Sequence, residues 1–553
     1  MYKRGVRLLA VALFFAVVAV AQPVISTRVP AVSSASYRTP GMPGSGIAQG
    51  SIFSVFGTGL GPDTLVQAFS FPLQTTLGGT SVTVTVGGTQ VSALILAALS
   101  YQVNAILPST TPAGTGTFTV TYNGQTSAPA PITVVQSAFG IYTYTSSGSG
   151  QAIATDVDFR INTIIHTFHP GDVGILWGTG LGAIKASDAE VPPTGNLPVP
   201  IKVYVGNTAA AVSYHGRSGC CAGLDQIAFQ IPQGVTGCYV PVAVEAGGIP
   251  GNIGNITTIA VSDSGQTCSD SVMGQDLVDQ LAAGKTVDFG YIRLESWIAK
   301  YLVGSAGNAN TDSAMATFSE YTPGTAGLAE YGVSSGYCVA VDCTNGCNVN
   351  TIDGSLSDSS PAQLDAGTLI SQTPPAVTLT QAGGFYEGYL STIGRYLWST
   401  ETYPVAGTGG AAVGAFNVND FTSIPTAEFT GIANAQTLPL SGDLTVQWTG
   451  GDPTLQNGQV TIFAESYNQL SENTIQAEYL QCTAPQAAGQ FTIPGWVMAA
   501  MEPSSTVTFQ SGSYPGGWIQ IGQYNKPTEF TATGLTRGII TDIFYNGIGV
   551  YFK

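Results

Sequence analysis

The segment SIFSVFGTGLGPD at residues 51–63 returns as DVGILWGTGLGAI at residues 172–184, and this repetition decides the fold. The run Gly-Thr-Gly-Leu-Gly at 57–61 is reproduced unchanged at 178–182. Further similar segments follow in the same order: 82–92 with 201–213, 101–108 with 225–232, and 116–127 with 237–248. Self-similarity of this kind indicates a duplicated domain with insertions between the shared segments.

Each copy has the pattern of short β-strands separated by turns. Val82, Val84 and Val86 alternate with threonines, as in a strand with one buried face. The dipeptide Asn123-Gly124 is typical of a tight hairpin. Short strands at roughly regular intervals predict β-sandwiches. The predicted organisation is a signal peptide at 1–21, immunoglobulin-like β-sandwich repeats at 22–136 and 137–262, and a β-rich region at 263–553. This last region is either one domain or two that divide near 365 or 436.

The glycine-rich runs invite comparison with phosphate-binding loops. Such loops need a helix directly afterwards, because its N-terminus holds the phosphate charge. Pro62-Asp63 follows the first run, and the chain after the second run reaches Pro192-Pro193 without helical periodicity. The spacing is also G-x-G-x-G rather than G-x-G-x-x-G. We therefore predict strand-ending turns in which glycine permits positive φ.

Two longer segments carry a family resemblance. SGIAQGSIFSVFGTGLGP (45–62) and GRSGCCAGLDQIAFQIPQGVTGCYVPVAV (216–244) resemble a duplicated module of exported acidobacterial proteins, the Solibacter-type uncharacterised C-terminal domain. The single copies are similar to the IPT/TIG immunoglobulin-like class. The resemblance covers about residues 31–262, and 263–553 is less distinctly similar to the β-rich partner region of such bacterial proteins. It implies an exported immunoglobulin-like protein and supplies no catalytic residues.

The first residues have the pattern of a secretory signal. Lys3, Arg4 and Arg7 precede the uncharged apolar run Leu8–Val20, and Ala19-Val20-Ala21 fits a signal-peptidase cleavage site. A membrane anchor is the alternative, but the run is shorter than the roughly 20 residues of a spanning helix. We expect a secreted protein, extracellular or at the cell surface, with the periplasm as the alternative. No membrane span is expected after cleavage.

The composition excludes one class of partner. Charged residues make up 9% of the chain and hydrophobic residues 44%, which provides an ample core. The chain has 16 Lys and Arg against 33 Asp and Glu, a net charge of −17. Nucleic acids are therefore excluded, because their phosphates require basic partners. A polysaccharide or a cell-surface protein remains as the expected partner.

Cysteines are confined to the second part of the chain. The disulfide candidates are Cys220, Cys221, Cys238, Cys268, Cys338, Cys343, Cys347 and Cys482. In an exported chain they predict disulfides, and proximity favours one group within 220–268 and another within 338–482. The sequence leaves the pairing open. Zinc at Cys343-x3-Cys347 is the alternative, although no histidine lies nearby.

The region 263–553 is expected to be mostly β. The predicted elements are a helix at 274–283, a strand within 286–302, a hairpin of 444–450 with 458–466 and Trp448 as a core anchor, a short helix at 494–501, and closing strands at 529–535 and 539–552 around Asn546-Gly547.

Several residue groups resemble sites without meeting their requirements. His166 and His169 have a spacing that can bind a metal ion on a helix, and Asp156 and Asp158 lie nearby. Pro170-Gly171 forbids the helix that would align the two rings, so the ordinary interpretation is polar residues in turns or on the surface. Loop 348–360 lacks the EF-hand pattern, and a structural calcium is the alternative to a solvated loop. No cofactor is predicted.

Two further patterns bear on enzymatic function. Residues 332–336 match G-x-S-x-G. A nucleophile elbow needs a helix directly after this motif, but the sequence predicts a strand there. Aromatic residues gather at Tyr386, Tyr389, Tyr396, Trp398 and Tyr403. Core packing is expected for most of them, with a sugar-binding platform as the alternative.

We therefore predict an all-β, non-enzymatic exported protein that acts in surface or extracellular binding or adhesion, through loops at the ends of its sandwiches. The alternative is a polysaccharide-active enzyme or enzyme accessory, with paired carboxylates in 263–553. A purely structural envelope or secretion component has the same composition.

Overall fold

The structure is a computed structural model that describes residues 22–270, 272–300, 309–325, 333–344, 361–372, 376–382, 385–391, 402–421, 427–451, 458–471, 474–509, 512–524 and 527–553. The predicted signal peptide and the loop 348–360, with its alternative of a structural calcium, lie outside these ranges. Within them the chain is almost entirely β, and the only α-helices are α1 (Gln275–Ala282) and α2 (Gly495–Ala500). The predicted all-β class and both predicted helices are confirmed.

The first repeat is a two-layer sandwich. One sheet has the order β1-β4-β9-β8-β5, and β2 also pairs with β4. Its strands are β1 (Val24–Ile25), β2 (Ala31–Ser33), β4 (Ile52–Thr58), β5 (Val66–Gln67), β8 (Leu94–Ala98) and β9 (Gln102–Ile106). The other has the order β3-β12-β10-β6-β7, and β11 pairs with β10. Its strands are β3 (Ile47–Ala48), β6 (Thr80–Val86), β7 (Thr89–Ser92), β10 (Gly114–Tyr122), β11 (Gln125–Thr126) and β12 (Ala130–Val135). The alternation in β6 buries all three valines between the layers, as predicted.

The second repeat has the same layout. One sheet has the order β13-β15-β19-β18, with β14 beside β15, and the other has the order β17-β16-β20-β21. The strands are β13 (Gly140–Ile141), β14 (Ala154–Thr155), β15 (Val173–Thr179), β16 (Ile201–Val205), β17 (Thr208–Ala210), β18 (Val212–Arg217), β19 (Asp225–Gln230), β20 (Gly237–Ala246) and β21 (Ile253–Val261). The order β4-β9-β8 corresponds to β15-β19-β18, and β12-β10-β6-β7 corresponds to β21-β20-β16-β17. The duplication seen in the sequence is therefore a duplication of the sheet order.

The glycine-rich runs are strand ends and turns, as predicted. Gly57 lies in β4, where a Cβ would come 2.1 Å from the carbonyl oxygen of Val24 on the paired strand β1. Gly180 follows β15 with a φ of 110°, a conformation that side chains with a Cβ rarely adopt. No helix follows either run, so neither has the geometry of a dinucleotide loop.

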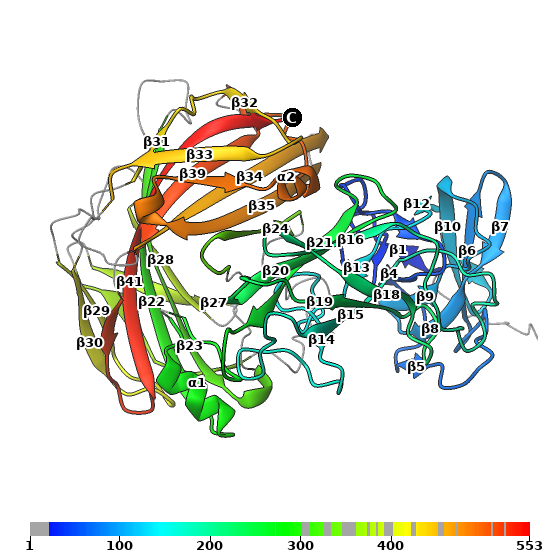
Figure 1. Cartoon of the computed structure of the whole chain (residues 1–553), viewed down its shortest axis with the longest axis horizontal. Coiled ribbons are helices and arrows are strands. Elements are labelled where there is room, and N and C mark those ends of the chain that lie inside the picture. The colour runs from blue at the N-terminus through cyan, green and yellow to red at the C-terminus, as the bar shows by residue number, and fades with distance from the viewer. Residues whose placement is uncertain are drawn as a thin grey trace, which may run out of the picture.

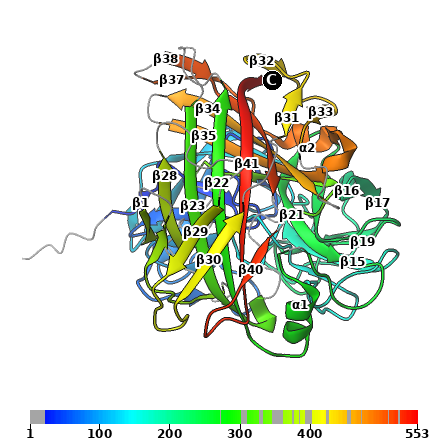
Figure 2. The same ribbon diagram turned by 90° about the vertical axis from the view of Figure 1, so that its left-hand side faces the viewer.

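The C-terminal region is built around one sheet of 15 strands. Its order is β24-β35-β34-β39-β41-β22-β23-β28-β27-β26-β29-β30, with β25 on β23 and with β32 and β40 on β41. The strands are β22 (Val287–Lys300), β23 (Ala309–Tyr321), β24 (Tyr337–Asp342), β25 (Ala362–Gln363), β26 (Leu369–Ser371), β27 (Val377–Ala382), β28 (Phe385–Ser391), β29 (Thr402–Gly407), β30 (Phe416–Phe421), β32 (Gln436–Leu438), β34 (Gln459–Ser471), β35 (Thr474–Pro485), β39 (Gly517–Tyr524), β40 (Thr528–Phe530) and β41 (Arg537–Phe552). The long strands run side by side down one face of the molecule (Figure 2).

The predicted hairpin of 444–450 with 458–466 is wrong. The strand β33 (Leu444–Thr449) pairs with β31 (Glu428–Thr430) and β36 (Gln490–Ile493) in a separate small sheet. The strand β34 pairs instead with β35 and β39 in the large sheet. Trp448 is buried between these layers, as predicted. A further hairpin joins β37 (Thr506–Phe509) and β38 (Gly512–Pro515).

The expected turn at Asn546-Gly547 is also wrong, because β41 passes straight through both residues. The Asn546 side chain donates to the carbonyl oxygen of Ala427 at 2.8 Å, which satisfies its amide inside the sheet. A Cβ on Gly547 would come 2.1 Å from the Trp518 ring. The glycine is therefore explained by the close packing of an indole ring and not by a turn.

The N-terminal segment fastens the repeats to the C-terminal sheet, which lies beside them (Figure 1). Arg38 and Glu478 form a buried ion pair at 2.9 Å, and Arg38 also donates to the carbonyl oxygen of Ala500. The backbone N–H of Thr39 donates to Asp342 at 2.6 Å. These contacts join residues that are hundreds of positions apart, so the segment before the first repeat is bonded directly to the C-terminal region.

The ion pair predicts a dependence of stability on pH. Burial raises the pKa of Glu478 from 4.5 to about 7, while Arg38 opposes this shift and Asp342 adds to it. Between these pH values the folded chain holds a proton that the unfolded chain has lost. Stability is therefore expected to fall between about pH 5 and pH 8, by on the order of 3 kcal/mol.

Thermal unfolding followed by circular dichroism across this range measures the effect. Glu478→Gln should reduce the fall, although Asp225, Asp270, Glu465 and Glu502 also have pKa values raised by burial. The exposed Glu190→Gln should leave the profile unchanged. The assignment would be contradicted if the unfolding temperature changed between pH 5 and pH 8 to the same extent in the wild-type protein and in Glu478→Gln.

Candidate functional site

A buried ion pair holds the two repeats together. Arg217 at the end of β18 and Asp225 at the start of β19 pair with each other, at 1% and 0% side-chain exposure. Asp225 also accepts hydrogen bonds from the backbone N–H groups of Gly180 and Leu181, at 2.9 and 2.8 Å. The anion-binding donors of the second glycine-rich run are thus occupied by a carboxylate of the same chain.

The arginine of this pair extends the contact to the first repeat. Its Nη2 donates to the carbonyl oxygen of Gly50 at 3.0 Å and to that of Gly182 at 2.8 Å. Beside it, the backbone N–H of Ile52 donates to the Thr179 hydroxyl at 2.9 Å. These bonds join β4 of the first repeat to β15 of the second.

A cleft of about 440 Å³ opens where the repeats meet. Its lining residues are Ser34, Tyr37, Ile52, Gln67, Ala68, Phe69, Leu96, Ala97, Asn104, Tyr142 and Ser146. The first repeat supplies an apolar floor and the amides, and the second supplies Tyr142 and Ser146. The volume lies in the range of small-molecule sites, roughly 300–1,000 Å³.

Hydrogen bonds fix the polar groups of this cleft. The Tyr142 and Ser34 hydroxyls lie 2.8 Å apart and come from different repeats. The Asn104 Oδ1 accepts from the Ser54 hydroxyl and from Gln102, both at 2.9 Å, which orients its amide group. Burial raises the pKa of Tyr142, so its hydroxyl remains protonated at physiological pH.

Backbone strain also gathers at the cleft. Tyr37 and Ser146 have φ values of 52° and 56°, and they are two of the five non-glycine residues with positive φ in the described ranges. Non-glycine residues in this conformation cost free energy and are enriched at functional sites. The cleft therefore combines strain, fixed polar groups and apolar surface.

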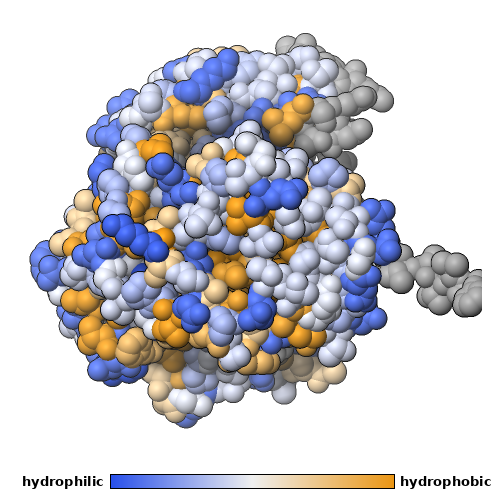
Figure 3. Space-filling view, turned by 90° about the vertical axis from the view of Figure 1, so that its right-hand side faces the viewer, coloured by the Kyte–Doolittle hydropathy of each residue, from blue (hydrophilic) through white to orange (hydrophobic). Residues whose placement is uncertain are grey.

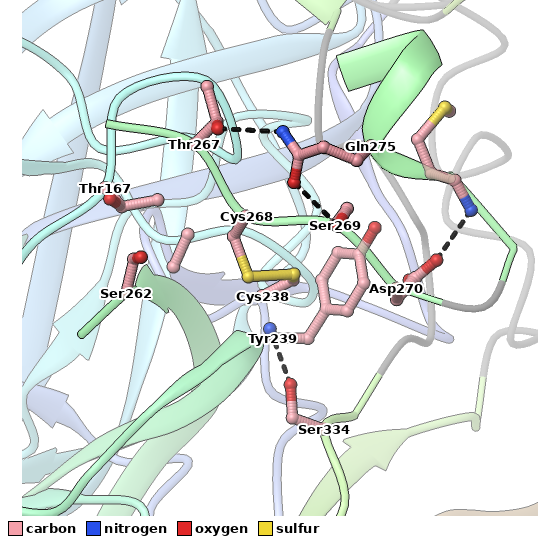
Figure 4. Close-up of a disulfide and its surroundings, with 12 residues drawn as sticks. Thr167, Cys238, Tyr239, Ser262, Thr267, Cys268, Ser269, Asp270, Gln275 and Ser334 are labelled. Atoms are coloured by element: carbon pink, nitrogen blue, oxygen red, sulfur yellow. Dashed lines mark hydrogen bonds between the residues drawn. A yellow bond between two sulfur atoms is a disulfide. The ribbon is translucent and has the colours of Figure 1, made fainter. Parts of the chain in front are cut away.

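The predicted disulfide bonding is present. Cys238 bonds Cys268, Cys338 bonds Cys482, and the adjacent Cys220 and Cys221 bond each other. Cys343 is also disulfide-bonded, and Cys347 lies outside the described residues. Figure 4 shows the Cys238–Cys268 bond, which ties β20 of the second repeat to the segment that leads into α1.

The residues considered as an alternative cation site are only partly brought together. His166 contacts Asp156 at 3.1 Å, but Arg160 pairs with both Asp156 and Asp158. His169 instead contacts Asp172 and the carbonyl oxygen of Gly265. Within the described ranges, no group of three or more His, Cys, Asp or Glu side chains is placed to hold a metal ion.

The serine of the G-x-S-x-G match has a structural partner. The Ser334 hydroxyl accepts a hydrogen bond from the backbone N–H of Tyr239 at 2.9 Å (Figure 4). The strand β24 follows it directly, as predicted, so the strand–turn–helix of a nucleophile elbow is missing. Ser334 joins the C-terminal region to the second repeat.

The predicted aromatic group is divided. Tyr386 and Tyr403 are buried in the core, as expected for most of the group, and Tyr389 is exposed. Tyr396 and Trp398 lie outside the described residues.

Sequence reasoning missed a second aromatic group on the large sheet. Trp297 on β22 stacks on Tyr545 of β41 with ring centroids 4.2 Å apart. The Arg293 guanidinium lies 2.6 Å from Glu295 and interacts electrostatically with Tyr524. Burial raises the pKa of Tyr524 and of Tyr545, which keeps their hydroxyls protonated. These residues are far apart in sequence, so only the strand order places them together.

Comparison with solved structures gives immunoglobulin-domain and surface-layer proteins at low similarity. The titin fragment I67–I69 is 8% identical with a TM-score of 0.10, covering 73% of this chain and 99% of that one. Sidekick-1 immunoglobulin domains 1–4 are 10% identical with a TM-score of 0.11, over 93% and 97%. The surface-layer protein rSbsC(31-844) is 12% identical with a TM-score of 0.18, and 54% of its length is covered, against 96% of this chain. At such scores the tandem sandwich assignment rests on the sheet order described above.

No protein-family profile and no curated protein matches the chain. In the part of the chain that the structure describes, no helix is long and apolar enough to cross a membrane.

Replacing Ser334 tests its structural role. Ser334→Ala removes the acceptor of the Tyr239 N–H, which should cost about 1–2 kcal/mol and lower the unfolding temperature. Calorimetric unfolding measures this loss, with Ser335→Ala as the matched control, because the exposed Ser335 hydroxyl donates to the half-buried Gln459. Hydrolysis of a chromogenic ester by the wild-type protein that Ser334→Ala abolishes would contradict the structural role.

Proposed function

We propose that this chain is a non-enzymatic exported protein that binds an extracellular polymer or a cell-surface component. The observation that carries the proposal is the cleft between the repeats, which offers fixed hydroxyl and amide groups over an apolar floor and no carboxylate. Such a lining suits recognition, because it holds no carboxylate, histidine or lysine, and burial raises the pKa of Tyr142 away from the range that favours general acid–base catalysis. The sandwiches position the cleft.

The covalent structure supports the proposed export of the chain. Disulfides persist in secreted and periplasmic proteins and are rare in a reducing cytoplasm. Three bonds are placed in the described ranges, and two of them lie at or near the contacts between the repeats and the C-terminal region. The signal-like first residues and the resemblance to the Solibacter-type exported module support the same compartment.

The surface of the repeats favours a defined binding site rather than a broad apolar interface. Figure 3 shows the repeat side of the molecule, where hydrophobic residues form several separate patches among polar ones. Large permanent protein interfaces require a more continuous apolar surface. The cleft is therefore the better supported place for recognition.

The geometry of the C-terminal sheet gives little support to the glycosidase alternative. Glu295 and Glu465 lie on the same aromatic face, but β41 and β39 separate their strands. Three strand spacings of about 4.8 Å separate the backbones of the two residues by roughly 14 Å, which is wide for a carboxylate pair of the kind used in glycoside hydrolysis, about 5–9.5 Å apart. Glu295 also accepts hydrogen bonds from Trp297 and Ser313.

A combined binding and hydrolysis assay tests the proposal. The disulfide-intact chain 22–553 is incubated with insoluble polysaccharides and isolated cell envelopes, with and without a chelator. We expect retention of protein on at least one of these materials and no released sugar, with no effect of the chelator. Soluble sugar above a heat-denatured control would contradict the non-enzymatic role, and absence of retention on every material would contradict the binding role.

A further inference from the structure

We propose that the cleft between the repeats binds an uncharged saccharide, so that the polymer recognised by this protein is a neutral polysaccharide. This inference rests on the proposed binding function and adds the chemical class of the ligand.

The uncharged lining of the cleft disfavours anionic ligands. The lining residues are serine, tyrosine, asparagine, glutamine, phenylalanine, isoleucine, leucine and alanine, and none of them carries a charge at physiological pH. A phosphate or carboxylate group placed here would lose its hydration without gaining a cationic partner. The net charge of −17 adds a general repulsion of anions. A neutral ligand avoids both costs.

The polar groups match sugar hydroxyls. Ser34 and Tyr142 share one hydrogen bond, so one of the two hydroxyl protons remains available to an incoming acceptor. The Asn104 Oδ1 is held by two bonds, which leaves its NH₂ group as a donor oriented by the sheet. Gln67 on β5 offers both a donor and an acceptor at the rim. This alternation of donors and acceptors complements a ligand whose hydroxyls do both.

The apolar surface matches the C–H face of a sugar ring. Phe69 lies at the cleft with 88% of its surface exposed, although an exposed phenyl ring is costly in water. Tyr37 presents a second ring, positioned against Phe56 with centroids 6.5 Å apart. Pyranose rings have one face of C–H groups that packs on aromatic side chains while the hydroxyls point to the edges.

The cleft is rigid and exists only in the tandem arrangement. Segment 146–148 of the second repeat packs so closely on segment 33–37 that a Cβ on Gly148 would come 2.1 Å from the Ser36 carbonyl oxygen. A Cβ on Gly140 would come 2.8 Å from the Ser36 N–H nitrogen. Because the walls are fixed before binding, little ordering entropy is lost when the ligand enters. Neither repeat alone contains both walls.

Titration calorimetry with soluble oligosaccharides tests the inference on the full chain 22–553. The neutral probes are short cello-, xylo- and mannooligosaccharides, and the acidic probes are oligogalacturonates. We expect at least one neutral probe to bind and the acidic probes not to bind. Binding of the acidic probes in preference to neutral ones, or of none of the neutral probes, would overturn the inference.

Two pairs of variants locate the binding. Phe69→Ala should weaken binding about tenfold, while Phe159→Ala, which removes a ring that is 65% exposed elsewhere on the second repeat, should have no effect. Tyr142→Phe removes only a hydroxyl and should weaken binding several-fold, with the exposed Tyr101→Phe as its control. Unchanged affinity in both cleft variants would overturn the inference.

The two proposals fail in different ways. Retention on insoluble polymer that survives Phe69→Ala and Tyr142→Phe would place the polymer site outside the cleft and overturn this inference alone. Oligosaccharide binding in the cleft without retention on any polymer or envelope would support the cleft and contradict the proposed function.

Discussion

The fold depends most on the buried pair of Arg217 and Asp225. Its carboxylate fills the backbone donors of the second glycine-rich run, and its guanidinium reaches the carbonyl oxygen of Gly50 in the first repeat. Removing one partner of a buried pair leaves an uncompensated charge, which costs roughly 3–5 kcal/mol. The pair therefore sets the orientation of the two sandwiches, and that orientation creates the cleft.

The duplicated repeats have diverged where they meet. In the aligned sequences Asp225 corresponds to Tyr101, so only the second copy has the acidic residue that satisfies its own turn. The Leu60 N–H of the first copy donates instead to the carbonyl oxygen of Ser100. One shared sequence motif is thus stabilised in two ways, because the second copy also has to dock on the first. Neither way leaves a vacant anion site.

Local patterns predicted the parts of the fold that depend on local physics. The valine alternation in β6, both short helices and the rejection of a nucleophile elbow at Ser334 follow from periodicity and turn chemistry. The hairpin through Gly458 and the turn at Gly547 failed because long-range strand pairing overrode local turn signals. The cleft had no signal in the sequence, since Ser34 and Tyr142 meet only when two folded repeats dock.

The most direct test of this account is hydrogen–deuterium exchange on the full chain, with and without a neutral oligosaccharide that binds. Exchange reports local opening of backbone hydrogen bonds, and a bound ligand slows it where the ligand contacts the chain. The account predicts added protection in segments 34–37, 96–98 and 142–146 together. Protection confined to 263–553, with these three segments unchanged, would contradict it.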